Sequence, residues 1–249
     1  FGTQECFIHQ LKDMKEALPG YDYIGVGRDD GKEKGEHSAI FYRTDKFDVI
    51  EKGDFWLSET PDVPSKGWDA VLPRICSWGH FKCKDTGFEF LFFNLHMDHI
   101  GKKARVESAF LVQDKMKELG KGKELPAILT GDFNVDQTHQ SYDAFVSKGV
   151  LCDSYEKAGF RYAINGTFNN FDPNSFTESR IDHIFVSPSF QVKRYGVLTD
   201  TYRSIVGKGE KKQANDCPEE IDIKTYQART PSDHFPVKVE LEFDQRQQK

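Results

Sequence analysis

Apolar and polar positions recur along the chain with two different periods. Apolar residues three to four positions apart, typical of an amphipathic helix, occur in residues 5–18 and 102–119. Alternation with period two, typical of a half-buried strand, is clearest in residues 235–243. Further strands are predicted at residues 21–27, 36–43, 47–57, 72–84, 88–97, 126–130, 181–187 and 191–198. This mixture predicts an α/β fold with both strand directions, as one domain over residues 1–244 followed by a polar tail, 245–249.

Polar side chains gather where predicted strands end. In residues 88–97 the alternation places Asn94 and His96 on the same face as the apolar residues before them, and the strand 126–130 runs into Asp132 and Asn134. A helix over 102–119 would join these two strands as a right-handed βαβ unit, so they would be parallel. Their carboxyl ends would then lie at the same edge of the sheet.

Two further polar pairs stand at the beginnings of strands. Asp182 and His183 precede the apolar run 184–186, and Asp233 and His234 precede the last strand. If these strands run antiparallel to the βαβ pair, all four polar ends meet at one rim. Carboxylates, carboxamides and imidazoles without cysteine suit Mg²⁺ or Mn²⁺ better than a soft metal. The pattern therefore predicts metal-assisted attack of water on a phosphate ester.

Composition narrows the class of protein. The chain of 249 residues is 37% hydrophobic and has 21 Phe, which is enough for a large core. Its net charge of -6 counts against a nuclease that binds nucleic acid non-specifically.

The five cysteines form no metal-binding motif, so we expect free thiols. No segment is long enough to span a membrane. The opening "FGTQEC" reads like the end of a strand, so we expect residues upstream and leave the compartment open.

Several motifs occur in a fixed order: "TQE", "GEHSAIFYR", "LPRICSW", "NLHMDH", "GDFN", "GTF", "RIDHIFVS" and "SDHFPV". In this order and spacing the chain resembles the endonuclease/exonuclease/phosphatase superfamily over residues 1 to about 243. The resemblance implies a four-layer α/β sandwich, in which two packed mixed β-sheets are flanked by helices, as in DNase-I-like proteins. That family's first strand carries an Asn near the metal, and we expect this strand to precede the residues of the given sequence.

The resemblance also implies roles for individual residues. It implies metal binding by Glu5, Asp233 and Asp132, with Mg²⁺ as the cofactor and Mn²⁺ as the alternative. Phosphate or substrate contacts are implied for Asn94, Asn134 and Arg74. The implied catalytic residues are His96 with Glu36 as its partner, His234 with Asp182 as its partner, and Asp132 and Asn134 as the groups that handle water and a phosphate oxygen. The role of general base stays open among the two histidines and Asp132.

Some residues have a plain structural interpretation. His9, His37, His80, His99 and His139 are expected to be surface or hydrogen-bonded histidines, and His183 a packing residue beside Asp182. The aromatic residues Phe168, Phe171 and Phe176 are interpreted as a loop core rather than a stacking platform. Asn165 in "NGT" matches a glycosylation acceptor, but we favour its assignment to the loop motif "GTF".

Three functions are compatible with these motifs. The favoured one is hydrolysis of a small phosphomonoester or phosphodiester, such as a sugar phosphate or a lipid head group, by a monomer. The alternatives are a DNA or RNA nuclease and an inactive binding module. Residues 205–229 resemble an insertion without clear structure of its own, which we expect to restrict the substrate. The candidate contacts there are Lys208, Lys211, Lys212 and Arg229, with Arg203 just before it.

Overall fold

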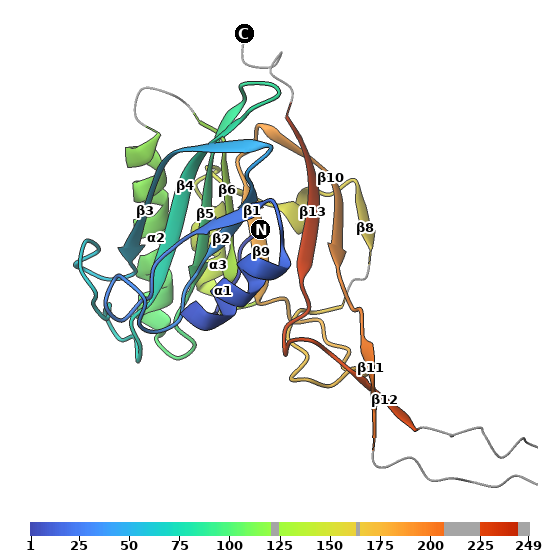
Figure 1. Cartoon of the computed structure of the whole chain (residues 1–249). Helices are drawn as coiled ribbons and strands as arrows, with labels where there is room; N and C mark the ends of the chain where they lie inside the picture. Colours follow the sequence, from blue (N-terminus) through green and yellow to red (C-terminus); the bar gives the residue numbers. More distant parts are fainter. Residues whose placement is uncertain (121–124, 163–164, 207–224, 244–249) are drawn as a thin grey trace, which may run out of the picture.

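A six-stranded mixed sheet forms the centre of the molecule (Figure 1). The computed structural model describes residues 1–120, 125–162, 165–206 and 225–243. The sheet contains, in spatial order, β3 (Phe47–Trp56), β4 (Ile75–Cys83), β5 (Glu89–His96), β6 (Ala127–Asp132), β9 (Asp182–Val186) and β7 (Cys152–Asp153). Strands β5 and β6 are parallel, and the helix α2 (Lys102–Leu119) lies between them in the chain. The predicted βαβ unit is therefore confirmed.

Helix α2 and the short helix α3 (Gln140–Val146) cover one face of this sheet. The core between them contains fully buried Phe93, Leu129 and Phe185 from the strands and Val112 and Phe145 from the helices. The first turn of α2 is capped from outside the helix, because Oδ1 of Asp69 accepts a hydrogen bond of 2.7 Å from the backbone N–H of Ala104. This packing holds the carboxyl ends of β5 and β6 in a fixed position.

The opposite face packs against a second layer of strands. One part is the three-stranded sheet β13-β10-β8, and the other is the antiparallel pair β1-β2. The bounds are β8 (Phe160–Tyr162), β10 (Phe190–Val197), β13 (Val237–Phe243), β1 (Tyr21–Ile24) and β2 (Ile40–Arg43). Ile184 of β9 packs against Val192 of β10, and Phe81 of β4 packs against Ile40 of β2. Helix α1 (Ile8–Ala17) covers this layer through Leu11. The architecture is the predicted four-layer α/β sandwich.

The structure differs from the predicted elements in several places, and the strands predicted at 21–27 and 36–43 are shorter, at 21–24 and 40–43. Helix α1 begins at Ile8 instead of residue 5, because Glu5 has a φ of 61°, which a right-handed helix excludes. The short elements α3, β7, α4 (Ser154–Lys157) and β8 were not predicted, since so few residues show no clear period. Residues 202–205 and 226–229 form an antiparallel ribbon, β11 and β12, so the ends of the predicted insertion do have structure.

Other expectations concern single groups. Cys6, Cys76, Cys83 and Cys152 are free thiols, as predicted, and Cys217 lies outside the described residues. His183 is 1% exposed and packs against aromatic rings, which confirms its assignment as a packing residue. Within the described part of the chain, every helix is too short or too polar to cross a lipid bilayer.

Candidate active site

The register of three neighbouring strands brings three side chains of the site together. Asp132, the last residue of β6, is paired with His96 of β5 on one side and with Asp182 of β9 on the other. The close approach of β5 and β6 requires Gly131, because a Cβ atom there would lie 2.3 Å from the backbone oxygen of Leu95. The glycine of "GDFN" thus serves the geometry of the site, and the predicted meeting of polar strand ends is confirmed.

Asp132 is the buried carboxylate at the centre of the site. Its Oδ1 accepts a 2.8 Å hydrogen bond from the backbone N–H of Asn134, and its Oδ2 lies 3.3 Å from Nε2 of His96. Burial and the nearby charge of Asp182 raise the pKa of Asp132 to about 7. At neutral pH this carboxylate can therefore take up or release a proton.

His96 is buried and held from several sides. The amide Nδ2 of Asn134 lies 3.1 Å from Nε2 of His96 and also donates a 3.0 Å hydrogen bond to the backbone oxygen of Met97. The tautomer with the proton on Nδ1 satisfies this contact, since Nε2 is then an acceptor. Burial, followed by the positive charges of Arg74 and Arg28, lowers the pKa of His96 well below its ordinary value. His96 is therefore a neutral imidazole.

The second histidine has a carboxylate partner. Nδ1 of His234 lies 2.8 Å from Oδ2 of Asp182, as the motif resemblance implied. Burial tends to lower the pKa of His234, but the hydrogen bond and the charge of Asp182 outweigh it and raise the pKa to about 9. His234 is thus an imidazolium at neutral pH. The two histidines of the site carry different charges because their surroundings differ.

Glu5 completes a group that could hold a cation. One ligand atom from each of Glu5, His96 and Asp132 lies within 4.8 Å of the others. Glu5 has a positive φ of 61°, which costs a non-glycine residue strain and is found most often at functional sites. Two carboxylates beside a neutral imidazole fit a divalent cation, whose positive charge would favour the ionised form of Asp132. Asp233, the other expected ligand, is not part of this group.

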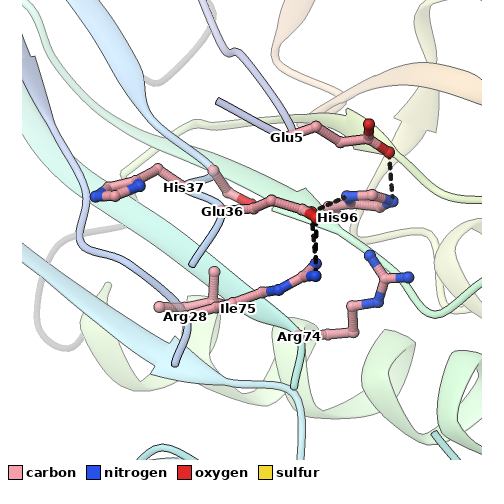
Figure 2. Close-up of a pocket in the computed structure, with 8 residues that line it drawn as sticks. Glu5, Arg28, Glu36, His37, Arg74, Ile75 and His96 are labelled. Carbon is pink, nitrogen blue, oxygen red and sulfur yellow. Dashed lines mark hydrogen bonds and ion pairs between the residues drawn. The ribbon is translucent and has the colours of Figure 1, made fainter. Parts of the chain in front are cut away.

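Glu36 is held by an arginine that the sequence did not single out. Nη1 and Nη2 of Arg28 lie 2.6 and 2.9 Å from the two carboxylate oxygens of Glu36. Oε2 of Glu36 lies 3.8 Å from Nδ1 of His96, which is too long for a hydrogen bond, and this Nδ1 has no other partner. Figure 2 shows that these side chains and Arg74 converge on His96. The Glu36 carboxylate thus lies near His96 without a hydrogen bond to it, and its role as partner of His96 stays a prediction.

Arg74 is buried and lines the same pocket, and its contact with substrate stays a prediction. Its Nε lies 3.4 Å from Oδ2 of Asp98, and its Nη2 lies 2.9 Å from Nδ1 of His99. Its Nη1 is buried without a partner, so one donor remains for an anion. His99 was predicted to be a surface or hydrogen-bonded histidine, and its bond to Arg74 gives it a place beside the site.

Asn94 lies differently from what the resemblance implied. Its side chain is 0% exposed, and its Nδ2 donates hydrogen bonds to the backbone oxygens of Thr3 and Ala39. Its Oδ1 accepts from Gln4 and Thr130. With all its hydrogen-bonding groups used inside the protein, Asn94 has none left for phosphate. It instead fixes the segment that ends in Glu5.

The predicted specificity residues are only partly described. Lys208, Lys211 and Lys212 lie outside the described residues. Arg229 is on β12, where its Nε donates a 2.6 Å hydrogen bond to Oγ of Ser204 within the ribbon. The ribbon extends away from the sandwich in Figure 1. Selection of substrate by residues 205–229 stays a prediction.

Two residues of the site were missed in the sequence. Arg28 follows the apolar strand "YDYIGVG" and stands eight positions before Glu36. The signal was an arginine directly after a buried strand, since such a charge needs a carboxylate partner. His99 follows Asp98 at the end of "NLHMDH", and no sequence pattern distinguished it from an ordinary surface histidine.

Known proteins resemble this chain in sequence and in fold. A family model described as "Endonuclease/Exonuclease/phosphatase family" matches residues 1–234. A solved mannosyl-6-phosphatase from Bacteroides thetaiotaomicron VPI-5482 is 86% identical, with a TM-score of 0.88, over 98% of this chain and 85% of that chain. An uncharacterized protein of Acanthamoeba polyphaga mimivirus is 31% identical over 96% of this chain and 84% of its own length.

A more distant relative acts on RNA by its name. The CCR4-Not complex 3'-5'-exoribonuclease subunit Ccr4 of Debaryomyces hansenii is 23% identical over 89% of this chain, which spans 30% of that protein. The family model, the close relatives and the paired histidine and carboxylate groups agree with one another. The chain belongs to the endonuclease/exonuclease/phosphatase family and is a hydrolase of phosphate esters.

Proposed function

We propose that the protein is a metal-dependent phosphatase that removes phosphate from a sugar phosphate monoester, with a mannosyl 6-phosphate as the best candidate. The observation that carries this proposal is the pairing of Asp132 with His96 on one strand and with Asp182 on the other, because Asp182 in turn holds the charged His234. The sugar phosphate is supported by the 86% identity to the mannosyl-6-phosphatase.

The residues present fit a bound cation. The carboxylates of Glu5 and Asp132 would hold Mg²⁺, with Mn²⁺ as the alternative, beside the neutral ring of His96, and the bound ion would supply positive charge against the phosphate oxygens. Arg74 has a free buried donor in the same pocket for the phosphate. A phosphate monoester carries nearly two negative charges, so a site with these cations favours it over a diester with one.

The reaction then follows from the protonation states. Asp132 accepts a proton from a water molecule as the water oxygen bonds to phosphorus, and the bond from phosphorus to the sugar oxygen breaks. Burial raises the pKa of Asp132 to about 7 in the metal-free protein, and a bound cation would lower it and keep the carboxylate ionised as a proton acceptor. His234, protonated and fixed through Nδ1 by Asp182, donates a hydrogen bond from Nε2 to a phosphate oxygen. The leaving sugar oxygen takes up a proton from solvent water, and Asp132 later returns its proton to solvent, giving free sugar and inorganic phosphate.

A substrate panel tests this proposal. With Mg²⁺ present, the release of phosphate from mannose 6-phosphate, glucose 6-phosphate and glycerol phosphate is compared with cleavage of bis(p-nitrophenyl) phosphate and of an RNA oligonucleotide. We expect the highest kcat/KM for a hexose 6-phosphate. Faster cleavage of the RNA or of the diester would instead support the nuclease alternative.

A further inference from the structure

Three phenylalanine side chains, Phe168, Phe171 and Phe176, lie exposed in the loop before β9. Phe168 is joined to His234 by an isolated β-bridge, and their ring centroids are 5.3 Å apart at an interplanar angle of 71°. Phe168 is 41% exposed and Phe171 is 62% exposed. The interpretation of these rings as a loop core is therefore wrong, because rings in a core are covered. One exposed aromatic ring touches a histidine of the active site.

The loop is fixed to the backbone of the site. The N–H groups of Asn169 and Asn170 donate hydrogen bonds of 2.7 and 3.1 Å to the backbone oxygen of Asp233. Oγ1 of Thr167 accepts hydrogen bonds from the backbone N–H groups of Ile181 and Asp182. The loop is thus attached both to the residue before His234 and to the partner of His234. These hydrogen bonds fix the loop backbone, which carries the aromatic rings, relative to His234 and Asp182.

The loop carries backbone strain at Phe171. Asn170 and Phe171 have φ values of 52° and 59°, and a bulky residue in this left-handed region is unfavourable. Oδ1 of buried Asn169 holds the turn by accepting a 2.8 Å hydrogen bond from the N–H of Phe171. Glycine or asparagine at position 171 would serve the fold better. Phe171, three positions after Phe168 in the same loop, is thus both strained and exposed, and such strain clusters at functional sites.

We propose that Phe168 and Phe171 form a platform on which the apolar face of the leaving sugar ring stacks while its phosphate lies at His234. This rests on the proposed function and names the residues that select its substrate. All phosphate monoesters present the same charged group, so discrimination among them must come from contacts with the leaving group. The C–H groups on one face of a hexopyranose are apolar, and an aromatic ring is a surface that they can cover.

The variant Phe171→Asn separates binding from folding. Asparagine accepts a positive φ, so we expect the melting temperature of the variant to equal or exceed that of the wild type. We expect kcat/KM for mannose 6-phosphate to fall about ten-fold relative to that for ethyl phosphate, which has no ring. Phe171→Trp should restore the ratio. Phe160→Ser, which removes an equally exposed ring on the outer strand β8, should leave the ratio unchanged.

Two results would overturn the platform: an unchanged ratio in Phe171→Asn, or an equal loss on both substrates. If the wild type does not hydrolyse mannose 6-phosphate, the proposed function itself fails. The platform is then judged by saturation-transfer NMR of mannose 6-phosphate with metal-free protein. Signal on the ring protons that is lost in Phe171→Asn supports the platform, and signal that is the same in both proteins, or absent from both, contradicts it.

Discussion

The carboxylates of Asp132 and Asp182 come from directly paired positions on the neighbouring strands β6 and β9. Their proximity contributes to the raised pKa of Asp132, and the Asp182 carboxylate raises the pKa of His234 through its hydrogen bond. The Asp182 carboxylate therefore raises the pKa of both Asp132 and His234. Asp132 and His234 are linked through Asp182, because Asp182 is paired with Asp132 across the strands and contacts His234 with its carboxylate.

Replacing Asp182 with Asn should disable the site without unfolding the protein. The amide has no negative charge, so the pKa values of both His234 and Asp132 should fall. We expect kcat to drop by roughly three orders of magnitude, as for other histidines that lose their carboxylate partner. The measurements are steady-state kinetics and NMR titration of His234 in EDTA. A kcat within about two-fold of wild type would contradict the assignment of this pair, since uncertainty in kinetics is far smaller than the predicted loss.

The stability of the metal-free protein should depend on pH through His234. Its pKa in the folded protein, about 9, lies above the ordinary value of 6.5, so its contribution is complete below pH 6.5 and is lost as pH rises through 9. Because the side chain is partly exposed, we expect this contribution to be about 2 kcal/mol. Urea unfolding in EDTA is compared for wild type and His234→Gln at pH 6 and pH 10. The advantage of the wild type should shrink at the higher pH, and an advantage that grows would contradict this account.

Glu5→Gln should weaken the binding of a divalent cation. The carboxamide keeps the shape of the side chain but removes the charge that attracts the ion. Calorimetric titration with Mn²⁺ should show at least about a ten-fold higher Kd, equal to about 1.4 kcal/mol. The control is Glu33→Gln, an exposed glutamate paired with Lys12. Equal Mn²⁺ affinity in the wild type and in Glu5→Gln would remove Glu5 from the metal site.

The buried pair of Arg28 and Glu36 should be worth more than a similar pair on the surface. Arg28→Met leaves the Glu36 carboxylate partly buried without a partner, and we expect a loss of roughly 2–4 kcal/mol in the free energy of unfolding. The matched control is Arg43→Met, because Arg43 makes the same two-bond contact with Asp45 in solvent. We expect a much smaller loss there, because an ion pair in solvent contributes little to stability.

A double variant separates charge from packing in this pair. Arg28→Met combined with Glu36→Met should recover part of the stability lost in the single variant, because neither charge is then left unpaired. It should not recover activity, since His96 loses the charge facing its Nδ1. Recovery of full activity in the double variant would show that Glu36 has no role at His96.

The sequence predicted the helices and strands in which the apolar pattern repeats over many residues. The strand with Val237 and Val239 alternates cleanly, and its burial alternates in the same way. Asp132 and Asp182 could be placed at one rim because each follows or precedes a buried strand. The short helix α3 could not be found, since seven residues with buried Ser141 and Tyr142 show no separate apolar face.

The errors in the site have a common physical cause. Whether Asn94 faces phosphate or the protein depends on the backbone oxygens of Thr3 and Ala39, which are distant in sequence. The partner of Glu36 is likewise decided by how the segment after β1 folds back, which places Arg28 beside it. Local patterns do not report such contacts. They can be predicted only when the tertiary packing is known.

The most direct test of the central claim follows mannose 6-phosphate by ³¹P NMR with the chelated and reconstituted protein. We predict no release of inorganic phosphate in EDTA, rapid release after Mg²⁺ or Mn²⁺ is added, and almost none with Asp132→Asn under the same conditions. The comparison with Asp132→Asn separates hydrolysis at this site from hydrolysis by a contaminant. Release that continues in EDTA, or that persists at the wild-type rate in Asp132→Asn, would contradict a metal-dependent sugar phosphatase built on Asp132.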